Sequence, residues 1–190
     1  MRFWPLPRRR AAGEPAGLPI SALEIRSLRP DETDAVARVL RHRVIVADRL
    51  ARQRRGECLY QIAWGVGRPV GQVLVHWRRP PAVAVAESLD ALPYLEDLYV
   101  LPEVREQGVA SALLAATERA AAERGHPGLT LAVSLDNAVA RRLYADRGYV
   151  EAGLPPHPQA TSEHGADAVV RNLEEMVVDL VRWLPPRHSG

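Results

Sequence analysis

Lysine is absent from this chain of 190 residues, so all 25 of its basic residues are arginines. Together with the abundance of alanine, this indicates a compositional bias of the source genome rather than a function. The single cysteine, Cys58, excludes an internal disulfide and a cysteine-based metal cluster, and it fits a reducing cytoplasm. A formal net charge of +2 gives no basis for binding nucleic acid.

The chain also lacks any apolar run long enough to span a membrane, and its N-terminus lacks the apolar core of a signal peptide. We therefore expect a cytoplasmic protein with no membrane partner. Hydrophobic residues make up 47% of the chain, which suits one globular domain with a sizeable core. Early prolines and the triplet Arg8-Arg9-Arg10 predict a flexible tail over 1–22, followed by a single domain over 23–184 and a short tail over 185–190.

Hydrophobic periodicity, with proline and glycine as breaks, predicts an alternation of strands and helices. The expected strands are 23–28, 58–64, 70–77, 94–100, 129–133 and 174–184, and the expected helices are 30–40, 44–54, 111–124 and 137–148. Residues 78–93 and 155–169 are expected to be connections without regular structure. The unit formed by 94–100, 111–124 and 129–133 should place its two strands parallel.

The segment from Leu98 to Ser111 is the most informative part of the sequence. A short apolar strand stops at Pro102, passes through a turn of small residues that includes Gly108, and continues at once as a helix. Free backbone N–H groups and the positive end of the helix dipole therefore meet at one place, where they can bind phosphate. The segment is neither the dinucleotide glycine fingerprint nor a nucleoside-triphosphate loop, and most such turns bind nothing.

Three ordered motifs give this turn a more specific meaning. They are Leu98-Tyr99-Val100-x-Pro102, Arg105-x-x-Gly108-x-Ala110 and Asn137-x-x-Ala140-x-x-Leu143-Tyr144-x-x-x-Gly148-Tyr149. Their combination resembles the GCN5-related N-acetyltransferase (GNAT) superfamily, closely over 94–150 and loosely over 23–93. The resemblance implies an α/β (α+β) fold with a mixed, largely antiparallel sheet of about six to seven strands and about four helices, splayed between strands 94–100 and 129–133.

The resemblance also implies acetyl-CoA as the cofactor. Its pyrophosphate would lie on the turn and first helical residues, which are Arg105, Glu106, Gln107, Gly108, Val109, Ala110 and Ser111. Its pantetheine arm would pair like an added strand with Leu98, Tyr99 and Val100. Asn137 either contacts the amide chain of the cofactor or only caps its helix, and Arg105 either adds a charged contact or is an ordinary surface residue.

Acyl transfer to an amine requires a base, a donor for the oxyanion and an acid for the departing thiolate. The resemblance assigns the oxyanion to the backbone N–H near Val100 and the acid to Tyr144, whose alternative role is a packed aromatic ring. Glu96 is the candidate base; otherwise it attracts a cationic substrate or lies outside the pocket. Strand alternation predicts that Glu96 shares a face with Leu98 and Val100, and that Asp97 points to the other face.

The acceptor is less well defined. The resemblance implies direct attack by a primary amine within a ternary complex, and the acceptor is a small molecule or a peptide or protein amine. Basic side chains near the acceptor region either select carboxylate-bearing acceptors or form a solvated surface, and the histidines show no metal-like spacing, so no metal is expected. These basic residues are Arg41, His42, Arg43, Arg49, Arg52, Arg54, Arg55, His76, His157 and His164, and Trp77 is expected in the same region.

Other functions stay open at this stage. One is a non-catalytic acyl-CoA-binding domain that acts as a sensor. Others are an acyltransferase that uses another acyl-CoA or a protein N-terminus, and a different nucleotide-phosphate enzyme built on the same turn. A homodimer is compatible with the sequence, which leaves the oligomeric state open.

Overall fold

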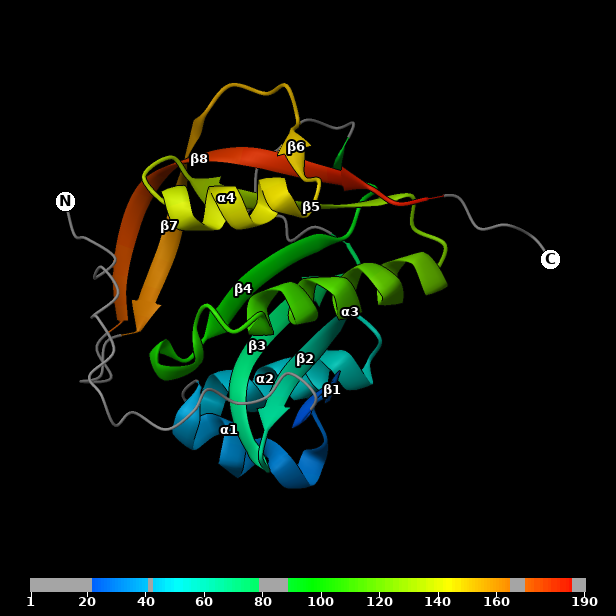
Figure 1. Cartoon of the computed structure of the whole chain (residues 1–190), viewed down its shortest axis with the longest axis vertical. Coiled ribbons are helices and arrows are strands. Elements are labelled where there is room, and N and C mark those ends of the chain that lie inside the picture. The colour runs from blue at the N-terminus through cyan, green and yellow to red at the C-terminus, as the bar shows by residue number, and fades with distance from the viewer. Residues whose placement is uncertain (1–21, 41–42, 79–88, 165–169, 186–190) are drawn as a thin grey trace.

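The computed structural model of the protein describes residues 22–40, 43–78, 89–164 and 170–185 (Figure 1). The described helices are α1 (Thr33–Val39), α2 (Arg43–Arg54), α3 (Val109–Glu123) and α4 (Ala138–Asp146), with 3-10 turns η2 (Pro30–Glu32) and η4 (Pro102–Val104). The described strands are β1 (Leu23–Ser27), β2 (Cys58–Gly65), β3 (Arg68–His76), β4 (Tyr94–Val100), β5 (Gly128–Ser134), β6 (Val150–Glu151), β7 (His157–His164) and β8 (Val170–Trp183). Apart from residue 22, the expected N-terminal tail lies outside the described residues, as do 186–190 and most of the connection 78–93.

The eight described strands form one sheet in the order β1-β2-β3-β4-β5-β8-β6, with β7 also paired to β8. Every pairing is antiparallel except that of β4 with β5, which is parallel as predicted. The mixed, largely antiparallel sheet and the four helices confirm the expected fold class. The sheet contains two strands beyond the six that periodicity predicted, because the two-residue β6 and the polar β7 both pair with β8.

The splay between β4 and β5 is also confirmed. Their ladder contains a single register pair, Tyr94 with Thr130. At the same place, the Thr130 N–H and hydroxyl both donate to the Pro93 carbonyl, at 2.9 and 3.1 Å. Beyond this point the two strands separate, and Figure 1 shows them diverging toward β7.

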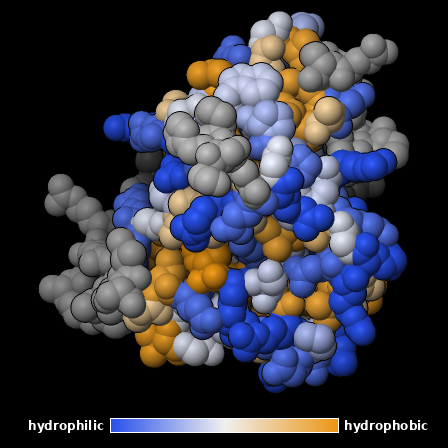
Figure 2. Space-filling view, turned by 90° about the vertical axis from the view of Figure 1, so that its right-hand side faces the viewer, coloured by the Kyte–Doolittle hydropathy of each residue, from blue (hydrophilic) through white to orange (hydrophobic). Residues whose placement is uncertain are grey.

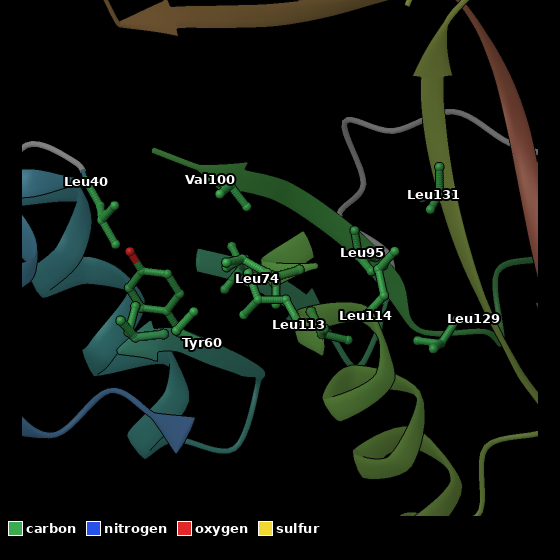
Figure 3. Packing of buried hydrophobic residues seen from close by; sticks show 14 of the residues in the cluster. Leu40, Tyr60, Leu74, Leu95, Val100, Leu113, Leu114, Leu129 and Leu131 are labelled. Carbon is green, nitrogen blue, oxygen red and sulfur yellow. The ribbon is translucent and has the colours of Figure 1, made fainter. Parts of the chain in front are cut away.

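Helix α3 holds the two sides of the splay together. It connects β4 to β5 in sequence, and its apolar side packs against both. Leu113 and Leu114 of α3 are fully buried in the same cluster as Leu95 of β4 and Leu129 of β5 (Figure 3). Burying each such side chain contributes about 2 kcal/mol. The N-terminus of α3 is therefore fixed close to the open edge of β4.

The prediction of a loop over 155–169 is wrong for its first part. His157–His164 is strand β7, and it pairs with the first half of β8, which begins at Val170 rather than near residue 174. The segment lacks an apolar alternation, so its extended shape comes from pairing with β8 rather than from local propensity. Residues 165–169 lie outside the described part of the chain.

The described surface is mainly polar, with apolar side chains in separate groups, as Figure 2 shows for one face. Large exposed apolar side chains, such as Val44, Val66 and Trp183, lie on different elements. Within the described ranges, no helix is both long and apolar enough to cross a membrane.

Candidate active site

The loop from β4 to α3 forms a concave run of backbone amides. Glu106 and Gly108 both have left-handed backbones, with φ of 62° and 82°. Gly108 is the N-cap of α3, and as a glycine it has no side chain with which to cap the N–H groups of the first turn. Those first-turn groups, from Val109 to Ser111, have no intrahelical acceptor, and they point toward the N-terminal end of the helix. Such a run of amides at the positive end of a helix dipole is suited to an anionic ligand.

Arg105 is tied to the end of β4 rather than free at the surface. Its Nε donates to the Val100 carbonyl at 3.0 Å, and its guanidinium carbon lies 5.9 Å from the ring centre of Tyr99. The arginine is half-buried. The strand expected to pair with the pantetheine arm and the loop expected to hold the pyrophosphate are thus joined through this side chain.

The alternation of β4 breaks at Asp97, whose φ is 55°. Glu96 lies opposite Leu74 and Val100 opposite Gly71, so five residues of β4 face four of β3. This is a β-bulge with one extra residue on β4. Directly opposed residues share a face of the sheet, and Gly71 and Leu74 point to opposite faces. Glu96 and Val100 therefore lie on opposite faces.

Two sequence predictions about β4 are wrong for this reason. Glu96 lies on the opposite face of the sheet from Leu98 and Val100. Asp97 points to the same face as Glu96. A Cβ built on Gly71, opposite Val100, would lie 3.3 Å from Val109 of α3, so Val100 faces α3. The carboxylate of Glu96 points instead to the face covered by α2.

Asp97 is engaged on the α2 face as well. Its Oδ2 accepts from Arg49 Nη1 at 2.6 Å and from Gln72 Nε2 at 2.5 Å. Gln72 in turn accepts from the Tyr60 hydroxyl at 2.6 Å. From the sequence, Asp97 is expected to point away from Glu96, and Arg49 is expected either to select a carboxylate-bearing acceptor or to lie on a solvated surface. The available signal was the adjacent pair of acids within an apolar strand, where regular alternation would bury one of them unpaired.

Glu96 is held by a histidine of the neighbouring strand. His76 Nε2 lies 2.8 Å from Glu96 Oε2, and Arg52 Nη2 lies 2.9 Å from His76 Nδ1. The His76 side chain is only 3% exposed, whereas that of Glu96 is 44% exposed. The hydrogen bond from His76 lowers the pKa of Glu96 below its ordinary value, against the opposing effect of burial. Glu96 therefore presents a stable carboxylate that remains accessible from outside.

Tyr144 is the buried residue of α4. It is 7% exposed, and its ring centre lies 5.6 Å from that of Tyr149. Burial raises the pKa of the Tyr144 hydroxyl far above that of an ordinary phenol, and Tyr94 adds to the shift. Tyr94 begins β4 two residues before Glu96, and its hydroxyl accepts from Gln159 Nε2 at 3.2 Å. Tyr94 is thus close enough to influence the Tyr144 hydroxyl, and it shares strand β4 with Glu96.

Asn137 occupies the N-cap of α4. Its side-chain oxygen accepts from the Ala140 N–H at 3.1 Å. The capping role considered from the sequence is therefore present. The same oxygen retains a second lone pair, so capping does not prevent a further contact.

The basic residues expected around the acceptor are dispersed. Arg41 and His42 lie outside the described residues, while Arg54 and Arg55 are exposed at the end of α2. His157 lies 3.6 Å from Asp179, a buried acid of β8. Among the described residues, no group of three or more histidine, cysteine or acidic side chains is arranged to hold a metal ion.

Comparison with known proteins gives a consistent result. The model of the Acetyltransferase (GNAT) family matches residues 22–149. The uncharacterized N-acetyltransferase YhfO of Bacillus subtilis is 38% identical over 64 residues, which cover 34% of this chain and 43% of that protein. The chain thus matches less than half the length of this curated relative.

Solved structures share the fold at low identity. An N-acetyltransferase from Staphylococcus aureus is 15% identical, with 86% of this chain and 99% of that chain covered and a TM-score of 0.61. The ribosomal-protein-S18-alanine N-acetyltransferase from Escherichia coli is 19% identical, with coverages of 88% and 96% and a TM-score of 0.59. A structure from Salmonella typhimurium that contains its cofactor acetyl-CoA is 18% identical, with coverages of 89% and 97% and a TM-score of 0.61.

Proposed function

The chain belongs to the GNAT family of acetyltransferases, and on that premise we propose that it transfers an acetyl group from acetyl-CoA to a primary amine. The observation that carries this proposal is the amide cradle at the start of α3. It combines two left-handed residues, Glu106 and Gly108, with a helix N-terminus whose N-cap residue, Gly108, has no side chain. Oriented N–H groups of this kind fit a diphosphate.

The residues that would hold acetyl-CoA follow from this fit. The backbone from Arg105 to Ser111 would bind the pyrophosphate. The edge of β4 beyond Tyr94, where the ladder with β5 ends, would pair with the amide groups of the pantetheine arm. Arg105 would brace both parts, because its side chain already connects the loop to the Val100 carbonyl.

Acetyl-CoA supplies, when bound, an acyl group on a thiol leaving group. Glu96 would take one proton from the acceptor ammonium, directly or through a water molecule. The backbone N–H near Val100 would donate to the acyl oxygen as it gains charge. Tyr144, which burial keeps protonated, would donate to the departing sulfur. In balance, a C–N bond forms, a C–S bond breaks, and one proton is released to solvent.

Calorimetry with acetyl-CoA, ATP and NAD tests the cofactor. Binding of acetyl-CoA alone is expected, and failure to bind it would remove the proposal. Binding of ATP or NAD instead would favour a different nucleotide-phosphate enzyme.

Release of free CoA with a panel of amines tests catalysis. The panel includes peptide amines, because the name of the Escherichia coli neighbour specifies a ribosomal-protein alanine as acceptor. Tight acetyl-CoA binding with no turnover on any amine would favour a non-catalytic sensor.

A further inference from the structure

We propose that Arg52 and His76 are positioning residues that hold Glu96 as a carboxylate with one oxygen reserved for an alkylammonium acceptor. This inference rests on the proposed function, because it assigns the acceptor class of the same site. It is carried by the geometry of three side chains from α2, β3 and β4.

The direction of the hydrogen bonds follows from the donor chemistry of arginine. A guanidinium has only donors, so His76 Nδ1, which lies 2.9 Å from Arg52 Nη2, must accept. The proton of the neutral imidazole is then on Nε2, which donates to Glu96 Oε2 at 2.8 Å. Both hydrogen bonds are therefore donated in the same direction: Arg52 donates to His76, and His76 donates to Glu96.

The surrounding charges distinguish Glu96 from the other carboxylates near it, Glu57 and Asp97, which are paired with arginines. Among the described residues, the charged and titratable groups facing this line include Arg49 from α2, Glu57 before β2, Tyr94 and Asp97 from β4, and Cys58 of β2, which lies directly opposite His76. Arg49 is matched by Asp97 at 2.6 Å, and Arg52 lies 3.7 Å from Glu57. Within the described ranges, the Glu96 side chain, which is 44% exposed, has His76 Nε2 as its ion-pair or hydrogen-bond partner at 2.8 Å.

This arrangement restricts what Glu96 can do. Oε2 is occupied by His76, so the acceptor meets Oε1. A proton taken by Glu96 cannot pass to His76, because Nε2 already carries a proton and Nδ1 accepts from Arg52. The proton must leave through solvent at the exposed carboxylate. The site therefore suits an amine that arrives as a cation, whose C–N bond forms after one proton moves to Glu96, and it disfavours neutral arylamines.

The tautomer is tested by nitrogen NMR of the full-length protein labelled with ¹⁵N-histidine. At pH 7, His76 is expected as the Nε2–H tautomer, with its signals assigned by their loss in His76→Gln. Arg52→Met removes the donor to Nδ1 and should abolish this preference. Arg119→Met, which removes an exposed arginine of α3, should leave it unchanged. An Nδ1–H tautomer or an imidazolium in the wild type would overturn the inference.

The positioning role is tested by kinetics with an alkylamine and an arylamine. His76→Leu should lower kcat/KM for the alkylamine by at least about tenfold. His76→Gln should restore most of it, because an amide can accept from Arg52 and donate to Glu96. Acetyl-CoA affinity should not change in either variant.

The outcomes separate this inference from the proposed function. Equal losses in His76→Leu and His76→Gln, or an arylamine used as well as the alkylamine, would overturn the inference while leaving an active acetyltransferase. A wild-type protein that does not bind acetyl-CoA would remove the proposed function and the inference with it. The alkylamine preference together with the Nε2–H tautomer would support both.

Discussion

Arg49 Nη1 donates to Asp97 Oδ2 at 2.6 Å and thereby ties α2 to the bulge of β4. Both side chains are almost completely buried, with exposed fractions of 9% and 10%. The positive φ of Asp97 is costly for a residue other than glycine, and the ion pair helps to hold it. The shape of β4 at the candidate site therefore depends on a residue 48 positions earlier in the chain.

Replacing Arg49 by methionine should destabilise the protein strongly. The change leaves the Asp97 carboxylate buried without its cationic partner, and breaking a buried pair in this way costs about 3–5 kcal/mol. Urea denaturation at pH 7 measures the free energy of unfolding. The matched control is Arg55→Met, because Arg55 lies 2.5 Å from Glu57 in an exposed pair and its loss should have no measurable effect. Equal effects of the two variants would contradict the role assigned to the buried pair.

Gly108→Val should weaken acetyl-CoA binding. Gly108 and Gly125 both have φ of 82°, and they flank the two ends of α3. Valine at either position introduces left-handed strain of about 1–2 kcal/mol. Only residue 108 lies in the proposed cradle, so calorimetry should find reduced acetyl-CoA affinity in Gly108→Val and unchanged affinity in Gly125→Val. Equal affinities would argue against the cradle.

Tyr144→Phe should lower turnover more than acetyl-CoA affinity. Burial raises the pKa of the Tyr144 hydroxyl, so the group is protonated throughout the neutral range and can donate to sulfur. Losing a general acid costs about 10²-fold or more in kcat. Tyr149→Phe is the control, since its ring lies 5.6 Å away and the proposal gives its hydroxyl no part in the reaction. Steady-state kinetics that leave kcat unchanged in Tyr144→Phe would remove the residue from its proposed role.

The pH dependence of kcat/KM should follow the acceptor rather than Glu96. The His76 hydrogen bond lowers the pKa of Glu96, so this carboxylate is ionised at all pH values above the ordinary glutamate pKa of about 4.3. Since the acceptor is proposed to arrive as an alkylammonium, kcat/KM should be level across the neutral range and should fall at higher pH, where the amine in solution loses its proton. Amines of lower pKa should shift this fall to lower pH, and Glu96→Gln should lower the whole profile without moving it. If the pH at which kcat/KM changes stays the same when the amine is changed, the titrating group would be on the enzyme, which would contradict this prediction.

Much of the fold could be predicted because its signals are local. Asn137 caps α4 and Gly108 opens α3 as their positions in the motifs indicate, and the expected strands 58–64 and 70–77 pair as β2 and β3. Strand β7 could not be predicted, because its extended form depends on pairing with β8.

The candidate site was less predictable because, like β7, it depends on contacts between elements that lie far apart in the sequence. Alternation gave the wrong face for Glu96 relative to Val100, since the bulge at Asp97 is held by Arg49 and Gln72 from other elements. His76 is a single buried histidine in an apolar strand, and only the fold reveals that Arg52 and Glu96 lie on either side of its ring.

The single register pair between β4 and β5 makes the sheet two half-sheets that share one helix. Local opening at the splay breaks few backbone hydrogen bonds, so amide protons beside it should exchange faster than those of β2 and β3. A ligand that binds only when both halves are in place stabilises their joined state by mass action. Cooperative unfolding of the whole domain would then depend on the concentration of acetyl-CoA.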